Sequence, residues 1–469
     1  MTKTMPVNTF DRYPMTWKPS RQMLGTGPVY LALAAALERD VLSGALPPGT
    51  KLPPQRELAD FLDLNFTTVT RAYDLCRDKN LVYGVTGRGT FVAPLPGVEE
   101  TDTDDAVIDL GAVQAFPKIG GRAIVTAAQN VLARDTATRL FSYADRDGKE
   151  RHRVAGQHWL ARCGVDAPVA RIAVFPGVQS ALSTTLLSVF GVGETLATDV
   201  FTYANLIHLA RLAHVKLVPV AGDDVGMCPD ALAEAAKRYR LRGVFLMPNC
   251  ANPTTRTLTE TRKDALAETI AATNLLLIED DATLAAPSRT RRPLQTRIPE
   301  RTLYLSGTTR LVSPGLRATY ATFPSALRER LLAGFHHTAI KASALEAEIL
   351  GELVLTGVAE KILREKAASA RTANRLFNRI LRPGGTGDPL RLFRTIPLPG
   401  TVGEGPEIER RCRADGVSVC HSDRFAVQNG RTDAFLRVSL SSATSMTRLG
   451  EGLQTLARRI RAGTISASS

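Results

Sequence analysis

The chain has 469 residues, of which 44% are hydrophobic, and it carries a formal net charge of +13. This length exceeds what one hydrophobic core usually supports, so we expect two or three domains. The basic balance is compatible with a polyanionic partner. No run of about 18 apolar residues occurs, and the first twenty residues lack the apolar core of a secretory signal. We therefore expect a globular cytoplasmic protein that neither enters a membrane nor is exported.

Six cysteines are scattered along the chain without a CxxC pair or a metal-binding spacing. A cytoplasmic setting keeps such thiols reduced, and we interpret them as small hydrophobes without chemistry. The sequence therefore predicts no metal site. The six are Cys76, Cys163, Cys228, Cys250, Cys412 and Cys420.

Three short helical patterns precede a glycine-rich hairpin in the first part of the chain. The apolar spacing predicts helices over 29–42, 55–62 and 67–79, with only a DLNF connection between the last two. Two short helices joined this tightly, then a hairpin tipped by Gly87, Arg88 and Gly89, are typical of a winged helix-turn-helix. We expect residues 1–94 to form this module.

The third of these helices would present polar side chains to DNA. It begins FTTVTRAY, which places Thr67, Thr68 and Arg71 near its N-terminal end, where base edges and phosphates are met. Arg56, at the start of the preceding helix, and Arg88, on the hairpin, are placed to reach phosphates or a minor groove.

The motifs LPPQRELADFLDLNFTTVTRAY and GRGTFV resemble the signature of the GntR family of bacterial transcription regulators. Several spaced elements agree in order, so the match is specific. The resemblance implies that the module binds operator DNA. It assigns operator contacts to Arg56, Thr67, Thr68, Arg71 and the wing glycine Gly89, and Arg88 is added from its position on the hairpin.

The stretch LPGVEETDTDDAVID separates this module from the rest of the chain. It is acidic and poor in aromatic residues, so it cannot bury a core. We interpret residues 95–109 as a linker and residues 110–469 as a larger domain.

In the larger domain, apolar strand-like runs such as RIAVF, GVFLMP and LLLIED alternate with helical stretches. This alternation predicts an α/β fold with a doubly wound, mostly parallel sheet and helices on both faces. Long helical patterns then lead to a tail of mixed character. We expect a small α+β subdomain over about 345–469.

Several motifs of this domain indicate a site for an anionic ligand. VFPGVQSAL reads as a strand, a glycine turn and a helix start, which presents backbone N–H groups to a phosphate. The motifs FTY, MPNCANPTTRT and LLLIEDDA follow, and an α/β enzyme binds ligands at the carboxyl ends of its strands. The last motif is SGTTRLVSPGLRATY. In chain order the candidate pocket residues are Val178, Gln179, Tyr203, Asn252, Asp280, Thr309, Arg310 and Arg317.

Together and in this order, the motifs resemble the fold-type I aminotransferases over about residues 108–465. A GntR module fused to such a domain is the architecture of the MocR regulators, and the whole chain resembles one of them. The resemblance implies a homodimer and a site derived from one for pyridoxal phosphate. It assigns Asp280 to the pyridine nitrogen, Tyr203 to the stacking aromatic, Asn252 to the asparagine common in aminotransferases, Arg317 to the phosphate, Arg437 to an effector carboxylate and Tyr143 to the partner subunit's phosphate.

The departures from that family concern cofactor chemistry. Arg310 replaces the Schiff-base lysine, Ala282 the tyrosine that bonds the ring hydroxyl, Gly307 a serine and Thr255 the glycine of NPTG. A guanidinium stays protonated and planar, so it cannot serve as the amine nucleophile. We therefore expect no catalytic residue, and we expect pyridoxal phosphate to be held non-covalently if it binds at all.

The remaining arginines would still suit a phosphate or carboxylate, because bidentate guanidinium groups favour such anions. Arg310 and Arg317 lie on one segment, and Arg437 is a third candidate. The alternative is a vestigial pocket in which Arg310 forms a buried ion pair with Asp280 or Asp281.

Three functional hypotheses remain. The first is a homodimeric transcription regulator whose aminotransferase-like domain senses a small anionic or amino-acid-like metabolite and repositions two DNA-binding modules. In the second, pyridoxal phosphate or its amino-acid adduct is the non-covalent effector. The third is an active aminotransferase with an accessory DNA-binding arm, and Arg310 counts heavily against it.

Overall fold

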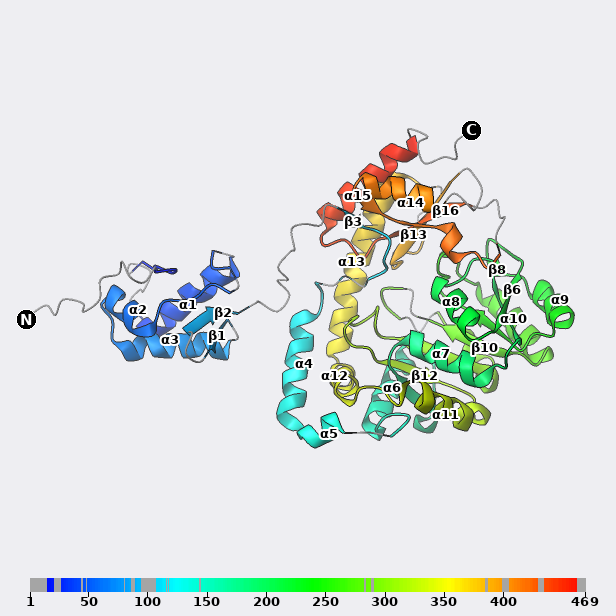
Figure 1. The fold of residues 1–469 in the computed structure, drawn as a ribbon, viewed down its shortest axis with the longest axis horizontal. Helices are drawn as coiled ribbons and strands as arrows, with labels where there is room; N and C mark the ends of the chain where they lie inside the picture. Colours follow the sequence, from blue (N-terminus) through cyan, green and yellow to red (C-terminus); the bar gives the residue numbers. More distant parts are fainter. Residues whose placement is uncertain are drawn as a thin grey trace, which may run out of the picture. The chain divides into compact units, whose positions relative to one another are not determined.

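The computed structural model divides into two compact units, Met1–Thr103 and Asp104–Ser469 (Figure 1). Most of the predicted linker, 95–109, lies outside the described residues. The structure describes residues 15–20, 27–43, 45–47, 49–79, 81–85, 89–93, 107–114, 116, 118–142, 145–281, 284–287, 291–383, 387–398, 405–428 and 434–461.

The described residues of the first unit form three helices and a two-stranded hairpin, as the winged-helix interpretation requires. The second helix ends at Asp63, which takes the left-handed conformation with a φ of 53°. Asn65 then caps the third helix, because its side chain accepts the hydrogen bond of the Thr67 backbone N–H. The helices bury a common core that includes Leu58 and Tyr73. The elements are α1 (Val29–Leu42), α2 (Gln55–Leu62), α3 (Phe66–Asp78), β1 (Val82–Val85) and β2 (Gly89–Val92).

The second unit is built on a seven-stranded sheet with the order β4-β12-β11-β10-β9-β5-β6. Its strands run parallel except β12, which is antiparallel to both of its neighbours. The predicted doubly wound, mostly parallel sheet is therefore confirmed. The strands are β4 (Ile172–Phe175), β5 (Thr195–Asp199), β6 (Lys216–Val220), β9 (Gly243–Leu246), β10 (Leu276–Asp280), β11 (Thr302–Gly307) and β12 (Thr319–Thr322), and a short hairpin is formed by β7 (Gly222–Asp223) and β8 (Gly226–Met227).

Helices cover both faces of this sheet. Along β9, Val244 packs with the residues of α9 and α10, whereas Phe245 packs with those of α7, α8 and α11. Successive side chains of a strand point to opposite faces, so a strand covered on both sides is apolar throughout. These helices are α7 (Val178–Val189), α8 (Ala204–Leu212), α9 (Pro229–Tyr239), α10 (Glu260–Ala272) and α11 (Arg328–Ala339).

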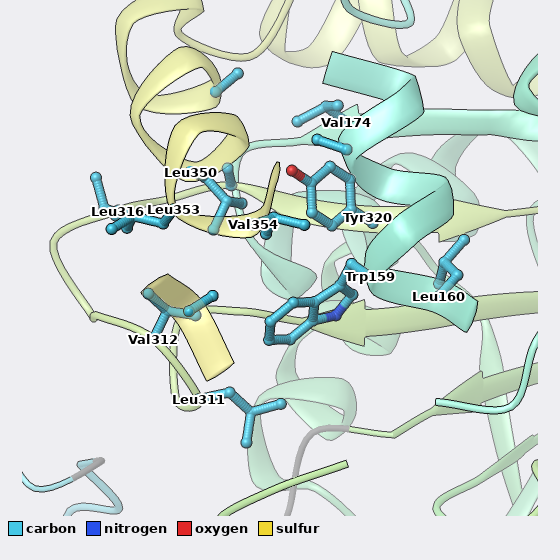
Figure 2. Packing of buried hydrophobic residues seen from close by; sticks show 14 of the residues in the cluster. Trp159, Leu160, Val174, Leu311, Val312, Leu316, Tyr320, Leu350, Leu353 and Val354 are labelled. Atoms are coloured by element: carbon cyan, nitrogen blue, oxygen red, sulfur yellow. The ribbon is translucent and has the colours of Figure 1, made fainter. Parts of the chain in front are cut away.

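Near β4 and β12, the sheet is covered by a large apolar cluster. Figure 2 shows Trp159, Tyr320 and Leu350 packed together in it. The Trp159 indole N–H also donates to Ser306 Oγ of β11 at 2.9 Å. The helices that enclose the cluster are α4 (Gly121–Arg134), α5 (Ala137–Phe141), α6 (Glu150–Arg162) and α12 (Ala344–Leu355).

The small α+β subdomain surrounds a three-stranded sheet of order β13-β16-β15. Its predicted start at about residue 345 needs correction, because α12 packs against α4 and α6 in the cluster of Figure 2. The predicted end of the linker needs correction as well, because Ile108–Asp109 form β3 and pair in parallel with β14. The elements are β3 (Ile108–Asp109), β13 (Phe393–Pro397), α14 (Gly405–Ala414), β14 (Val417–Ser418), β15 (Cys420–His421), β16 (Phe435–Ser439) and α15 (Met446–Arg461).

The 24-residue helix α13 (Val358–Leu381), yellow in Figure 1, joins the two parts of the second unit. Near its start, Ala359 and Ile362 are buried in the large cluster. Near its end, Ala373 and Phe377 are buried in the core of the small subdomain. Among the described helices, none combines the length and apolar character that crossing a bilayer requires.

Candidate functional site

The exposed side of α3 carries Thr67 and Arg71, two of the residues predicted to contact DNA, while Thr68 is half-buried. Thr67 donates its backbone N–H and its hydroxyl to Asn65 Oδ1, at 2.9 and 2.8 Å. Tyr73 is buried on the opposite side of the helix, in the core of the unit. The start of α3 is therefore held in place and presents polar side chains to solvent.

Two of the predicted arginines rest on aromatic rings. The guanidinium carbon of Arg71 lies 4.2 Å from the ring centroid of Tyr30, and that of Arg56 lies 5.6 Å from the centroid of Phe66. Both arginines are exposed. Such contacts restrict a guanidinium at the surface while leaving its charge available to a phosphate.

The wing is described only in part. Gly89 opens β2 with a φ of 117°, and a Cβ there would lie 3.1 Å from Lys51 Cε, so the position suits glycine. Arg88 lies outside the described residues, and its role stays a prediction. On α3, Thr70 donates its hydroxyl to Gln55 Oε1 at 2.9 Å, which ties α3 to α2.

In the second unit, seven of the predicted pocket residues line one cavity of about 200 Å³. It lies at the carboxyl ends of the parallel strands, which is where α/β sheets bind their ligands. We name it the arginine cavity. It is lined by Val178, Gln179, Tyr203, Asn205, Asp280, Gly307, Thr309, Arg310 and Arg317.

Both cavity arginines belong to the segment between β11 and β12, which is anchored in the core. Leu311 and Val312 are buried in the cluster of Figure 2. Lys366 Nζ of α13 donates to the Val312 carbonyl at 2.6 Å. Within this fixed segment Arg310 is half-buried and Arg317 is exposed. The core therefore sets where the two guanidinium groups emerge.

The N-terminus of α7 forms one end of the arginine cavity. Its N-cap is Gly177, with a φ of 86°, and no side chain caps the helix. The unpaired N–H groups and the dipole of such a helix end favour an anion. A Cβ on Gly177 would lie 2.8 Å from Arg317 Nη2, so the glycine allows this guanidinium to approach the helix end. Two positive groups thus meet at one place.

Asp280 ends β10 and is 3% exposed. Its Oδ1 has no hydrogen-bond partner among the described residues. Burial raises the pKa of its carboxyl to about 6, the charge of Arg310 opposes this rise, and Asp281 adds to it. A buried carboxyl without a partner is unfavourable, so this group suits a ligand that offers an N–H or a cation.

Replacing Asp280 by Asn should make stability less sensitive to pH. Because the folded pKa of Asp280 is above its ordinary value of 3.8, the folded state binds the proton more tightly, and the contribution of this carboxyl to stability falls as pH rises from about 4 to about 6. Relative to wild type, Asp280→Asn should therefore gain about 2–3 kcal/mol in free energy of unfolding between pH ~4 and pH ~7, as measured by urea titration.

Asp223→Asn is the control for this experiment, because it should change the stability at neutral pH in the opposite direction. A hydrogen bond from Arg262 lowers the pKa of the exposed Asp223 carboxyl to about 2, so its charge stabilises the fold above its ordinary pKa. This variant should be less stable than wild type at neutral pH. A parallel pH profile for wild type and Asp280→Asn would contradict the assigned burial of Asp280.

One wall of the arginine cavity is a hydrogen-bonded triangle. Asn205 Nδ2 donates to Gln179 Oε1 at 3.2 Å and to the Tyr203 hydroxyl oxygen at 3.1 Å. The Tyr203 hydroxyl donates to Gln179 Oε1 at 3.4 Å. The guanidinium carbon of Arg310 lies 5.7 Å from the centroid of the Tyr203 ring. The triangle therefore fixes the ring that Arg310 faces.

Arg310 forms no ion pair with Asp280 or Asp281 among the described residues. Asp281 is engaged elsewhere, because its Oδ1 accepts from Asn249 Nδ2 at 3.1 Å and its Oδ2 accepts from the Tyr304 hydroxyl at 2.8 Å. Asp280 keeps an unpartnered oxygen. The alternative in which a buried ion pair closes the pocket does not describe this structure.

Asn252 and Arg437 bind each other instead of lining the arginine cavity. Arg437 Nη1 donates to Asn252 Oδ1 at 3.0 Å, and Nη2 donates to the Gly111 carbonyl. Burial lowers the pKa of Arg437, and the nearby charge of Arg310 adds to that lowering. The predicted role of Arg437 with a carboxylate therefore requires a ligand that displaces Asn252. Tyr143 lies outside the described residues.

Two lining residues, Asn205 and Gly307, were not among the predicted pocket residues. Asn205 stands two residues after Tyr203, in the first turn of α8, so its place beside a strand end was a usable signal. Gly307 ends β11 and contributes only backbone, which no side-chain motif can indicate.

The comparisons with known proteins first define the structural class of the second unit. Residues 116–357 match the family described as aminotransferase class I and II. A solved archaeal alanine:glyoxylate aminotransferase has a TM-score of 0.69 at 20% identity, over 76% of this chain and 91% of that chain. LysN, an α-aminoadipate aminotransferase of Thermus thermophilus, has a TM-score of 0.67 at 21% identity, over 76% and 92%. The second unit therefore has the fold-type I aminotransferase fold.

The first unit and the full-length relatives define the family. Residues 29–92 match the bacterial regulatory proteins of the gntR family. The HTH-type transcriptional regulator YdeF of Bacillus subtilis is 31% identical over 461 residues, covering 97% of this chain and 99% of that protein. The vitamin B6 salvage pathway transcriptional repressor PtsJ of Salmonella typhimurium is 27% identical over 310 residues, covering 64% and 69%. The chain belongs to the GntR family and is a DNA-binding regulator with an aminotransferase-like domain.

Pyridoxal phosphate is the cofactor that this fold implies. The end of α7 with Arg317 suits its phosphate, and the unpartnered oxygen of Asp280 suits its ring nitrogen. No lysine is among the described residues that line the arginine cavity. Lys366 and Lys263 are buried and bonded elsewhere, to the Val312 carbonyl and to Asn249 Oδ1. The described residues that line the arginine cavity therefore fit the phosphate and the ring nitrogen of this group, and none of them offers an amine.

Proposed function

We propose that this regulator binds a small anionic metabolite non-covalently in the arginine cavity and that this ligand alters how its two DNA-binding units, in a homodimer, engage an operator. The observation that carries the proposal is the meeting of Arg310, Arg317 and the uncapped end of α7 around one cavity. An effector acts by binding one arrangement of a protein more tightly than another.

The charged groups around the arginine cavity favour an anionic ligand. Arg310 and Arg317 have no ion pair with a carboxylate among the described residues, and the helix end adds positive potential. Asp280, the one acid among the described lining residues, has a raised pKa, so it gives up its proton less readily than an ordinary carboxyl does. Phosphate esters and carboxylates are the metabolite groups that match this arrangement.

A specific observation favours one candidate, pyridoxal phosphate itself or its adduct with an amino acid. Asp280 offers its unpartnered oxygen in the same cavity as Arg317 and the end of α7, and a phosphorylated pyridine would use both. Among the relatives, PtsJ is named as a repressor of vitamin B6 salvage. The solved LysN structure holds a phosphopyridoxyl derivative of leucine.

We do not propose catalysis, because transamination in this fold depends on a lysine amine and Arg310 cannot provide one. The wild-type chain should show no transfer of amino groups from any of the twenty amino acids to pyruvate or 2-oxoglutarate. Turnover above that of a heat-denatured sample would support the aminotransferase alternative.

The regulatory function is tested by an electrophoretic mobility shift with DNA from upstream of the chain's own gene. We expect the protein to prefer this DNA over unrelated DNA of equal length by about a hundredfold or more, with an affinity that falls steeply as salt rises. Inorganic phosphate, pyridoxal phosphate and its amino-acid adducts are then added. Equal affinity for both DNAs, with and without these ligands, would refute the proposal.

A further inference from the structure

A second cavity, larger than the arginine cavity, lies in the same unit and has a volume of about 410 Å³. On one side it is bounded by the carboxyl ends of β5, β6 and β9, and on the other by β13 and β16 of the small subdomain. The described residues that line it do not include any that line the arginine cavity. We name it the second cavity.

Most of the side chains that line the second cavity are apolar. Leu246 and Met247 line it from the large part of the unit, and Leu398 and Phe435 line it from the small subdomain. Each of the four is less than a tenth exposed. The Phe435 ring also meets Phe201 edge to face, with 5.1 Å between the ring centroids. Walls of this kind suit the apolar body of a small organic molecule.

Asp199, the last residue of β5, is the one carboxylate among the described lining residues. Its side chain makes no hydrogen bond or ion pair within the described part of the chain. Burial raises the pKa of this carboxyl to about 6, and the charge of Arg256 partly opposes the rise. An acid in an apolar cavity without a partner of its own gains most from a ligand that brings a cation.

Arg256 lines the second cavity from a more exposed position. Its Nη2 lies 3.6 Å from Asp224 Oδ1, and the Asp224 side chain is fully exposed. A loose pair of this kind at the surface contributes little to stability. A ligand carboxylate can therefore take the place of Asp224 beside Arg256.

We propose that the second cavity binds a small organic ammonium ion whose apolar body packs against these walls and whose charge pairs with Asp199. The ligand is an alkyl or aryl amine, or an amino acid with an apolar side chain whose carboxylate reaches Arg256. The ammonium group that Asp199 would bind is opposite in charge to the anionic group proposed for the arginine cavity.

The second cavity shares a wall with residues of the predicted effector site. Ala251 and Thr254 line it on either side of Asn252, the residue that binds Arg437. Thr395, which also lines it, is paired in register with Arg437 across β13 and β16. An amine in the second cavity is thus placed to bias the Asn252–Arg437 pair.

The proposal is tested by isothermal titration of the full-length chain with phenethylamine and hexylamine. We expect one site per chain for both amines, and no binding of 3-phenylpropionate that competes with them. Asp199→Asn should weaken both amines by about tenfold or more, because it removes the charge that pairs with the ammonium group. Phenylalanine distinguishes the two kinds of ligand. If phenylalanine binds more tightly than phenethylamine, and Arg256→Gln abolishes this gain in affinity, the natural ligand is an amino acid. If phenylalanine binds more weakly than phenethylamine, the natural ligand is an amine.

Asp224→Asn is the matched control, since it removes a nearby acid that does not line the second cavity, and it should leave amine affinity within about twofold. Ala434→Leu narrows the cavity without changing charge and should weaken both amines even if Asp199→Asn folds poorly. Failure of both amines to bind, or full affinity in both Asp199→Asn and Ala434→Leu, would overturn the proposal while leaving the anionic effector to be judged separately.

Discussion

Arg310→Lys is expected to give the regulator the ability to hold pyridoxal phosphate covalently. The anchored segment between β11 and β12 would carry an amine at the position that Arg310 occupies, while the end of α7 and Arg317 would remain to bind the phosphate. A lysine amine can become the nucleophile that a guanidinium cannot. After incubation with pyridoxal phosphate and reduction with borohydride, intact-mass spectrometry should show one added phosphopyridoxyl group per chain in this variant.

Two proteins serve as controls for this experiment. Wild type should lose all bound pyridoxal phosphate on denaturation, with or without borohydride. Arg310→Met has a side chain of comparable length with neither amine nor charge, and it should bind more weakly than wild type and stay unmodified. A phosphopyridoxyl group on wild type would show that another lysine reaches the cofactor. An unmodified Arg310→Lys would show that the cavity no longer accepts it.

Arg71→Ala is expected to reduce operator affinity by about tenfold or more and to lower the slope of log affinity against log salt by about one. Arg71 is exposed on α3, and its guanidinium is held over the ring of Tyr30, so it reaches DNA with little loss of side-chain freedom. Fluorescence anisotropy with labelled operator DNA at several salt concentrations measures both quantities.

Arg77→Ala is the matched control on the same helix. Arg77 is exposed near the C-terminal end of α3, and its Nη1 bonds Asp74 at 2.7 Å. Base and phosphate contacts are concentrated at the start of such a helix, so this change should cost less than about threefold in affinity. Equal losses in the two variants would mean that general charge, rather than the position of Arg71, determines binding.

The sequence predicts the layout of the fold well because buried parallel strands are continuous apolar runs. Six such runs correspond to β4, β5, β6, β9, β10 and β11, and the 29–42 pattern coincides with α1. β12 escapes this reasoning because its four residues, TYAT, begin and end with threonine and so form no apolar run. The packing of α12 could not be predicted either. An apolar helical sequence indicates that the helix is buried, but it does not indicate which core the helix packs in.

The sequence predicts most of the residues that line the candidate site, but it predicts few of the hydrogen bonds and ion pairs among them. Motifs at strand ends locate Asp280 and Tyr203, because the carboxyl ends of parallel strands lie at one edge of the sheet. The bond between Asn252 and Arg437 and the lack of one between Arg310 and Asp280 depend on side-chain directions within a few ångström. Spacing in the sequence does not carry that information.

The long helix α13 bears on how a ligand's effect can travel through the second unit. A helix of 24 residues is about 36 Å long and does not compress. One end is embedded with Ile362 in one core and the other with Phe377 in another. If the small subdomain closes over a bound molecule, it must therefore rotate about α13 or bend this helix. A translation of one part relative to the other along the helix axis is not possible.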